Sequence, residues 1–315
     1  MLNFAINVDI NYKMAKFLIS IVGPTAIGKT ALSIKLAQHF NTEVISADSR
    51  QFFKEMYIGT AAPSKKELAL VKHHFIHHKS VEEEYNVGAF ERDVISKLDE
   101  LFKTHETIIM VGGSGLYVDA VTKGLDDFPD IDPQIRKGLN KQLKTKGLES
   151  LQEQLKTLDI ESYNTIAIDN PHRVIRSLEV CIGTDLPYSS FLKKNKTQRN
   201  LKTISIGLTA DRQLIYTRIN ERVDNMIEEG LLEEAKALLP KQHLNALNTV
   251  GYKELFNYFN GEWELDFAIS EIKKNTRRFA KRQLTWFRKD ETINWFDYKT
   301  NPDSIIEHIK NQIKS

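Results

Sequence analysis

The sequence predicts an α/β protein: a P-loop core built on a doubly wound parallel sheet, an all-helical insertion domain and a helical C-terminal part. Three observations predict this fold. An apolar run at 17–22 enters a G-x-x-x-x-G-K-T loop at 23–30, which a helical run follows. Further apolar runs alternate with helical segments, as in parallel sheets. Between about Asp126 and Asp185 this alternation stops, and helical segments follow one another.

Five short apolar runs are expected to be the strands of the sheet. Apolar runs of this length, entering a glycine loop or a polar turn, are typical of strands that are buried on both faces. The first helix is indicated by Leu32, Leu36 and Phe40, which recur at helical spacing. The expected strands are 17–22, 44–46, 108–111, 203–208 and 293–296, and the expected helices include 31–40 and 90–103.

The helical segment in the middle of the chain is interpreted as an insertion. Pro129 and Pro133 lie near its start, and stretches rich in Leu, Lys and Gln follow without a convincing strand. The expected helices are 134–147 and 148–158. The expected domains are a P-loop core with C-terminal helices, residues 1–125 and 186–315, and a helical insertion, residues 126–185.

Composition sets limits on the class of protein. A chain of 315 residues with 41% hydrophobic content can bury a large core, and its net charge of +2 gives no global basic field. The single cysteine, Cys181, excludes a disulfide framework and a cysteine-based zinc site. No apolar run approaches the length of about 18 residues that a membrane span needs. Polar residues interrupt the segment from Met1 to Lys16, so we expect no signal peptide and a cytoplasmic location. We also expect no membrane partner and a monomer.

The glycine loop predicts a phosphate site. Its backbone amides and the start of the following helix direct partial positive charge at one point, and Lys29 adds a full charge. Thr30 is placed to reach Mg²⁺, partly through water. The expected phosphate-binding residues are Gly23, Pro24, Thr25, Ala26, Ile27, Gly28, Lys29 and Thr30.

The carboxylate expected near this phosphate is in an unusual place. In ordinary P-loop ATPases an aspartate after a neighbouring strand holds magnesium, but here the strand 108–111 ends in glycine and serine. Asp48 instead follows the strand 44–46, at the same edge of the sheet as the loop. Asp48 could hold Mg²⁺ through water, accept a proton from a nucleophile, or cap a turn.

Two groups of basic residues have alternative interpretations. Arg218 and Arg222 share a helix face and could clamp a phosphate or form surface ion pairs with Glu221 or Glu228. The helix 272–289 carries eight basic residues and no acid, which favours polyanion binding over a solvated surface. Its apolar residues recur every seven positions and are expected to face the core: Ile272, Phe279 and Trp286.

Two smaller clusters are less specific. Arg173 and Arg176 share a face of the helix that starts after Pro171, where they could contact nucleic acid or simply begin a helix. Four histidines near position 75 lack the cysteines or the H-E-x-x-H spacing of a metal site, so we expect surface or turn residues there. These are His73, His74, His77 and His78.

The ordered set of motifs resembles the tRNA dimethylallyltransferase family over nearly the whole chain, from Lys16 to about Phe296. The motifs that carry the resemblance are Gly23-Pro24-Thr25-Ala26 through Lys29-Thr30, Asp48-Ser49-Arg50-Gln51, Ile58-Gly59-Thr60-Ala61, His73-His74, Gly112-Gly113-Ser114-Gly115-Leu116-Tyr117, Arg173 with Arg176, Val250-Gly251-Tyr252, and Lys281 through Arg288. Ile27 and His172 depart from the residues that are usual in the family.

The resemblance implies a reaction and a set of roles. Members transfer a dimethylallyl group from dimethylallyl diphosphate to N6 of adenine 37, next to the anticodon, in tRNAs that read codons starting with U. The product is N6-(dimethylallyl)adenosine. By this resemblance, the loop 23–30 holds the diphosphate with Mg²⁺, Asp48 is the general base, Thr25 lies near the reacting centre and Arg222 binds the diphosphate.

The resemblance also implies contacts with the anticodon stem-loop of tRNA, including contacts from the helical insertion. The residues implied are Asp48, Ser49, Arg50, Gln51, Ser114, Arg136, His172, Arg173, Val174, Ile175, Arg176, Thr249, Val250, Gly251, Tyr252, Lys253, Glu254, Lys281, Arg282, Gln283, Leu284, Thr285, Trp286, Phe287 and Arg288. The target adenine would have to leave its stack to reach Asp48.

Two alternatives share the loop and the sheet. A small-molecule or nucleotide kinase would not need the basic helix near the C-terminus, and it would release ADP from ATP with a small acceptor. A non-catalytic P-loop RNA-binding protein would not need Asp48, so replacing Asp48 would leave its RNA affinity and its effect intact.

Overall fold

The computed structural model describes residues 16–192 and 199–314. The expectation for the N-terminal segment before Lys16 lies outside these residues. The described chain forms two compact units, one within Met1–Thr122 and Arg199–Ser315, the other within Lys123–Gln198. The second unit contains the predicted insertion 126–185 and extends beyond it at both ends.

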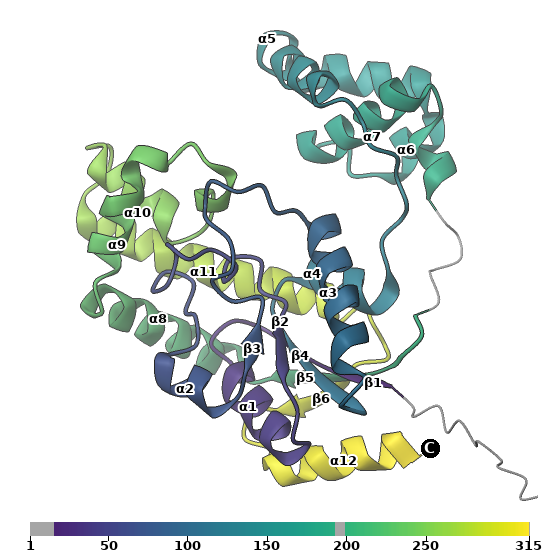
Figure 1. The fold of residues 1–315 in the computed structure, drawn as a ribbon. Coiled ribbons are helices and arrows are strands. Elements are labelled where there is room, and N and C mark those ends of the chain that lie inside the picture. The colour runs from purple at the N-terminus through teal and green to yellow at the C-terminus, as the bar shows by residue number, and fades with distance from the viewer. Residues whose placement is uncertain (1–15, 193–198, 315) are drawn as a thin grey trace, which may run out of the picture. The chain divides into compact units, whose positions relative to one another are not determined.

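A parallel sheet of six strands forms the centre of the first unit (Figure 1). The five predicted strands are present, and the predicted fold class is confirmed. The sheet also contains one short edge strand, β3, whose two histidines we expected in a turn or at the surface. The strands are β1 Phe17–Val22, β2 Val44–Ser46, β3 His73–His74, β4 Thr107–Val111, β5 Lys202–Thr209 and β6 Asn294–Asp297, in the order β3-β2-β4-β1-β5-β6.

Helices cover both faces of this sheet. Neighbouring residues of a strand point to opposite faces, and apolar residues lie on both. Leu18 and Ile108 belong to the core cluster that includes α3 (Val87–Leu101) and α4 (Gly115–Lys123). Ile19 and Ile109 belong to the cluster that includes α1 (Lys29–His39) and α12 (Pro302–Lys314). Figure 1 shows these two pairs of helices on opposite sides of the strands. The helices of this unit are α1 Lys29–His39, α2 Lys65–Leu70, α3 Val87–Leu101, α4 Gly115–Lys123, α8 Arg212–Glu228, α9 Leu231–Leu238, α10 Tyr252–Phe259, α11 Leu265–Phe287 and α12 Pro302–Lys314.

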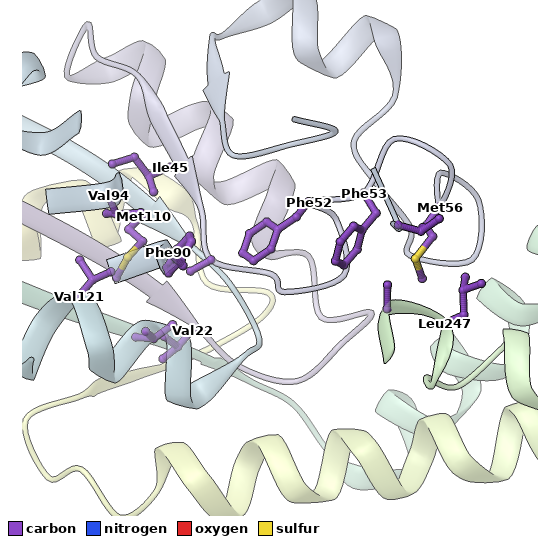
Figure 2. Packing of buried hydrophobic residues seen from close by; sticks show 14 of the residues in the cluster. Val22, Ile45, Phe52, Phe53, Met56, Phe90, Val94, Met110, Val121 and Leu247 are labelled. Carbon is purple, nitrogen blue, oxygen red and sulfur yellow. The ribbon is translucent and has the colours of Figure 1, made fainter. Parts of the chain in front are cut away.

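The loop between β2 and α2 extends the first core toward the site. Phe52, Phe53 and Met56 are buried in the cluster that includes α3 and α4. Figure 2 shows them in a row between the strand residues and Leu247, which precedes α10. The segment after Asp48 is therefore anchored between the sheet and the C-terminal helices.

The second unit is helical and has its own core. It contains α5 Pro133–Leu158, α6 Ile160–Thr165 and α7 Pro171–Thr184. Gly147 interrupts α5 with φ +79°, at the boundary between the two predicted helices 134–147 and 148–158. Asp159 is buried where α5 meets α6, and its carboxylate accepts hydrogen bonds from Ser162 and Ser189. The core residues are Leu139, Leu151, Leu155, Val174, Ile175, Leu178 and Cys181.

Among the helices that the structure describes, none combines the length and the apolar character needed to cross a membrane.

Candidate active site

The glycine loop has the backbone that a phosphate cradle requires. Gly23 has φ +139°, and a Cβ there would lie 2.5 Å from the carbonyl oxygen of Leu208, so a larger residue does not fit. Gly28 has φ +103° where α1 begins, and the amides at the start of α1 are free of a side-chain cap. The loop thus presents a helix N-terminus to an anion.

The side chain of Lys29 forms hydrogen bonds with the backbone of its own loop. Its Nζ donates to the carbonyl oxygens of Gly23 at 2.9 Å and Pro24 at 2.7 Å. Burial of the ammonium lowers the pKa of Lys29 to about 7, while Asp48 acts in the opposite direction and Arg222 in the same direction. An anion placed against this ammonium would favour its charged form and raise its pKa again.

Asp48 lies at the carboxyl edge of the sheet, beside the loop. The backbone there is fixed by Ala47, whose N–H donates to Val111 at 2.8 Å, and by Asp48 itself, whose Oδ1 accepts from the N–H of Arg50 at 3.1 Å. The turn-capping role and the functional role are therefore compatible. The charge of Asp48 acts on Lys29, Arg50 and Arg222, so it sits among cations.

Asp48 borders two hollows. The larger is a cleft of about 680 Å³, lined also by Thr25, Arg222 and Gly113. The smaller, of about 40 Å³, is lined also by Lys29 and Thr30. One carboxylate thus faces both a phosphate-loop cavity and a cleft large enough for a flat heterocycle.

Arg218 and Arg222 both reach the glycine loop from α8. The Nε of Arg218 donates to the carbonyl oxygen of Ala26 at 2.7 Å, and a guanidinium nitrogen of Arg222 lies 3.4 Å from the Oγ1 of Thr25. Only Arg222 lines the cleft. The clamp interpretation fits this geometry, with Arg218 fixing the loop and Arg222 facing the cleft.

Gln283 joins two loops of the site, a role that the sequence analysis missed. Its Oε1 accepts from the N–H of Thr25 at 2.9 Å, and its Nε2 donates to the carbonyl oxygen of Gly113 at 2.9 Å. Gln283 is buried, and its two hydrogen bonds hold these loops together beside the cleft. The spacing of Ala280, Gln283 and Phe287 along one helix face is the signal that could have found it.

The expected core-facing stripe of α11 is wrong for two of its three residues. Ile272 is buried at 2% exposure, but Phe279 and Trp286 are each 38% exposed and line the cleft. A strict repeat of seven drifts around a straight helix, and the buried stripe passes instead through Ala280, Gln283 and Phe287. The two aromatic rings are therefore available for stacking.

The basic residues of α11 fall into two groups. Near its middle, Lys273 pairs with Asp224 at 2.5 Å and Lys274 with Glu271 at 2.7 Å, as in an ordinary mixed-sign surface. Further along, Lys281, Arg282 and Arg288 are exposed, and Arg282 lines the cleft. The basic residues that could bind a polyanion are thus those in the C-terminal half of the helix.

Several residues predicted to contact RNA have buried side chains. Two of them also line the cleft, and an RNA contact at these residues stays a prediction. Tyr252 and Glu254 hold loops near the cleft, the latter by accepting from the N–H of Gly251 and from Asn275. The buried predicted residues are Val174, Ile175, Tyr252, Glu254, Gln283 and Phe287, and Leu284 is packed against the core cluster of α1 and α12.

Around Asp48, four residues predicted to contact tRNA form hydrogen bonds within the protein. Gln51 donates to the carbonyl oxygens of Thr60 and Ala61, and its Oε1 accepts from Ser46. Arg50 donates to the carbonyl oxygen of Ala246 at 2.8 Å. The Oγ of Ser114 accepts from the N–H of Ser49 at 3.1 Å. The residues predicted to contact RNA that line the cleft are Asp48, Ser49, Arg50, Ser114, Thr249, Val250, Gly251, Lys253, Glu254, Arg282, Gln283 and Trp286.

In the second unit, two of the predicted arginines share one acid. Arg136 donates to both carboxylate oxygens of Glu179, at 2.9 and 2.8 Å, and Arg176 donates to the same carboxylate at 2.9 Å. These pairs hold the pKa of the Glu179 carboxyl below its ordinary value, against the effect of burial. His172 and Arg173 are exposed at the start of α7. A tRNA contact at these four residues stays a prediction.

The oxygen atoms near the loop are suitable ligands for a magnesium ion that binds together with the substrate. Thr30, Ser46, Asp48 and Gln51 offer hydroxyl, carboxylate and amide oxygens around the smaller cavity, and Mg²⁺ prefers oxygen. Within the described residues there is no group of three or more His, Cys, Asp or Glu side chains that could form a complete cage. The residues near the loop fit an ion that a diphosphate helps to hold.

Fold and site together define a P-loop protein whose glycine loop lies beside a carboxylate and a wide cleft. The family model described as "IPP transferase" matches residues 51–290. The chain belongs to the IPP transferase family.

Curated relatives match almost end to end. The chain is 61% identical over 302 residues to the tRNA dimethylallyltransferase of Christiangramia forsetii, covering 96% of this chain and 100% of the relative. It is 58% identical over 306 residues to the enzyme of that name from Flavobacterium johnsoniae, covering 95% and 99%. The family and these relatives support the transferase interpretation and give the kinase alternative no support.

Solved structures that are similar to this chain are also described as transferases. The full-length tRNA isopentenylpyrophosphate transferase of Bacillus halodurans superposes with a TM-score of 0.68 at 38% identity, covering 95% of this chain and 96% of that one. A eukaryotic dimethylallyltransferase described as acting on tRNA superposes with a TM-score of 0.79 at 25% identity, covering 94% and 79%.

Proposed function

We propose that this chain transfers a dimethylallyl group from dimethylallyl diphosphate to N6 of adenine 37 in tRNAs that read codons starting with U. The observation that carries the proposal is the position of Asp48, which borders both the phosphate-loop cavity and the larger cleft. An acceptor in the cleft and a diphosphate on the loop would meet at this carboxylate.

The step forms one bond and breaks another. The N6 nitrogen of the adenine attacks C1 of the dimethylallyl group, the C1–oxygen bond breaks, and the diphosphate leaves with the bonding electrons. Asp48 takes the proton that N6 loses, as a general base. The loop amides, Lys29 and Arg222 stabilise the negative charge that develops on the leaving diphosphate. Thr25 lies beside Arg222 at this point of the site.

Magnesium, when bound with the diphosphate near Thr30, would neutralise part of the leaving-group charge. The half-exposed rings of Phe279 and Trp286 give a flipped base a surface on which to stack.

The direct test is mass spectrometry of nucleosides from tRNA incubated with the protein, magnesium and dimethylallyl diphosphate. We expect N6-(dimethylallyl)adenosine, and we expect none when magnesium is removed by a chelator. If ATP were consumed with a small acceptor while the tRNA stayed unmodified, the kinase interpretation would replace this proposal.

The exposed end of α11 should carry a measurable share of tRNA binding. We expect Lys281→Ala and Arg282→Ala each to weaken tRNA binding and to reduce the slope of log K against log salt by about one unit. Lys273→Ala is the matched control, because Lys273 is already paired with Asp224 on the same helix and should leave the slope unchanged. Equal slopes in all variants would remove α11 from the interface.

Diphosphate binding should take up a proton. Burial lowers the pKa of Lys29 to about 7, so at about pH 8 most of the Lys29 side chain is the neutral amine. A bound diphosphate restores its charge. We expect uptake approaching one proton, and an affinity that falls as pH rises above about 7. Calorimetry in two buffers of different ionisation enthalpy measures this uptake. In Lys29→Arg, whose side chain stays charged, the uptake should vanish; uptake that persists there would assign the proton to another group.

A further inference from the structure

Glu234, on α9, is surrounded by donors from a distant segment. Its Oε2 accepts from the backbone N–H groups of Tyr57 at 3.0 Å and Ile58 at 2.8 Å. Its Oε1 accepts from the N–H of Gly59 at 2.9 Å and from the hydroxyl of Tyr252 at 2.7 Å. Three successive amides that point at one carboxylate form an anion-binding nest, and here the protein fills it with its own acid.

The segment held by Glu234 is part of the cleft wall. We call residues 57–61 the wall loop, because Gly59, Thr60 and Ala61 line the cleft together with Asp48. Its other end is held by Gln51, which donates to the carbonyl oxygens of Thr60 at 3.3 Å and Ala61 at 3.2 Å. The wall loop is thus fixed from two sides.

Gln51 connects the wall loop to the turn that carries Asp48. The N–H of Gln51 donates to the carbonyl oxygen of Asp48 at 3.2 Å, and its Oε1 accepts from Ser46 at the end of β2. A displacement of the wall loop would therefore pull on the turn that sets the direction of the carboxylate.

Tyr252 completes the support. Its side chain is fully buried, and a Cβ on Gly59 would lie 2.6 Å from its ring, so the ring packs directly against the wall loop. Burial, together with the charge of Glu234 and the hydrogen bond to it, raises the pKa of Tyr252, which keeps the phenol protonated and able to donate. Before the wall loop, Phe53 and Met56 are anchored in the core (Figure 2).

We propose that Glu234 is a positioning residue for prenyl transfer: it fixes the wall loop and, through Gln51, the orientation of Asp48. This inference rests on the proposed function and assigns a role to a residue that contacts neither of the proposed substrates. A carboxylate is needed because it accepts from four donors at once, whereas an amide would place its own N–H₂ among them.

The test compares single-turnover prenylation by Glu234→Gln with that by Glu233→Gln, which alters the exposed neighbour on the same helix. Small errors in the orientation of a catalytic group are costly, so we expect the rate of Glu234→Gln to fall by about tenfold or more. Dissociation constants for tRNA and dimethylallyl diphosphate should stay within about twofold. Hydrogen exchange at the amides of 57–59 should speed up in Glu234→Gln alone.

Tyr252→Phe supplies a milder variant in case Glu234→Gln does not fold. It removes one hydroxyl and keeps the ring against Gly59, so we expect about a threefold loss of rate with unchanged binding constants. A rate for Glu234→Gln equal to that of Glu233→Gln, or a rate loss matched by weaker tRNA binding, would overturn the inference. An inactive wild-type protein would instead overturn the proposed function, on which the inference depends.

Discussion

Asp48→Asn is expected to reduce prenyl transfer by about a thousandfold, while tRNA and dimethylallyl diphosphate still bind. Asparagine keeps the oxygen that accepts from the N–H of Arg50, so the turn should survive. What it loses is the ability to accept the proton from N6. Asp48 also borders the cavity where magnesium would bind, so diphosphate affinity is compared without magnesium. Removing a negative charge near Arg222 should then leave that affinity unchanged or slightly higher. Single-turnover rates and separate binding titrations measure these quantities.

The matched control is Asp297→Asn. The Oδ1 of Asp297 accepts from the N–H two residues on, at 2.9 Å, which is the same turn contact that Asp48 makes, and Asp297 lines neither hollow. It should leave the rate unchanged. A variant at position 48 that turns over at the normal rate would exclude Asp48 as the base, and one that loses tRNA binding alone would make it a recognition residue.

The central strands could be predicted because nearly all of their residues are apolar. Strands β1 and β4 are buried on both faces, so almost every residue carries the signal. Strand β3 was missed because two histidines at the sheet edge have neither length nor apolar character, and only their pairing with Val44 and Ile45 makes them a strand.

The parts of the site that depend on fixed spacing could also be predicted. The loop and its lysine are contiguous, and Asp48 follows a recognisable strand. The contacts that connect loops far apart in the sequence could not be predicted, because neither the link from Gln283 to Thr25 nor that from Glu234 to Gly59 has a local pattern. The error on Phe279 arose from extending a seven-residue repeat along a helix that does not follow it.

Arg222→Met should give the second large effect, and Arg218, one turn earlier on α8, gives the comparison. Arg222 lines the cleft beside Thr25 and would contact the leaving diphosphate, so its loss should reduce the rate by about a hundredfold to a thousandfold. Arg218 only holds the carbonyl oxygen of Ala26, where the loop has φ +63°, so Arg218→Met should cost about tenfold through a less ordered loop.

Comparison of Arg222→Met with Arg218→Met separates stabilisation of the diphosphate charge from positioning of the loop. The guanidinium of Arg222 is buried and therefore poorly solvated. This burial, followed by the charge of Arg218, lowers the pKa of Arg222, and an anion that arrives there would stabilise its charged form. Inorganic diphosphate should therefore bind much more weakly to Arg222→Met than to Arg218→Met, and isothermal titration with diphosphate tests this ranking directly. The reverse ranking would place the leaving group on the other side of the loop, against Ala26, and would remove Arg222 from the transfer step.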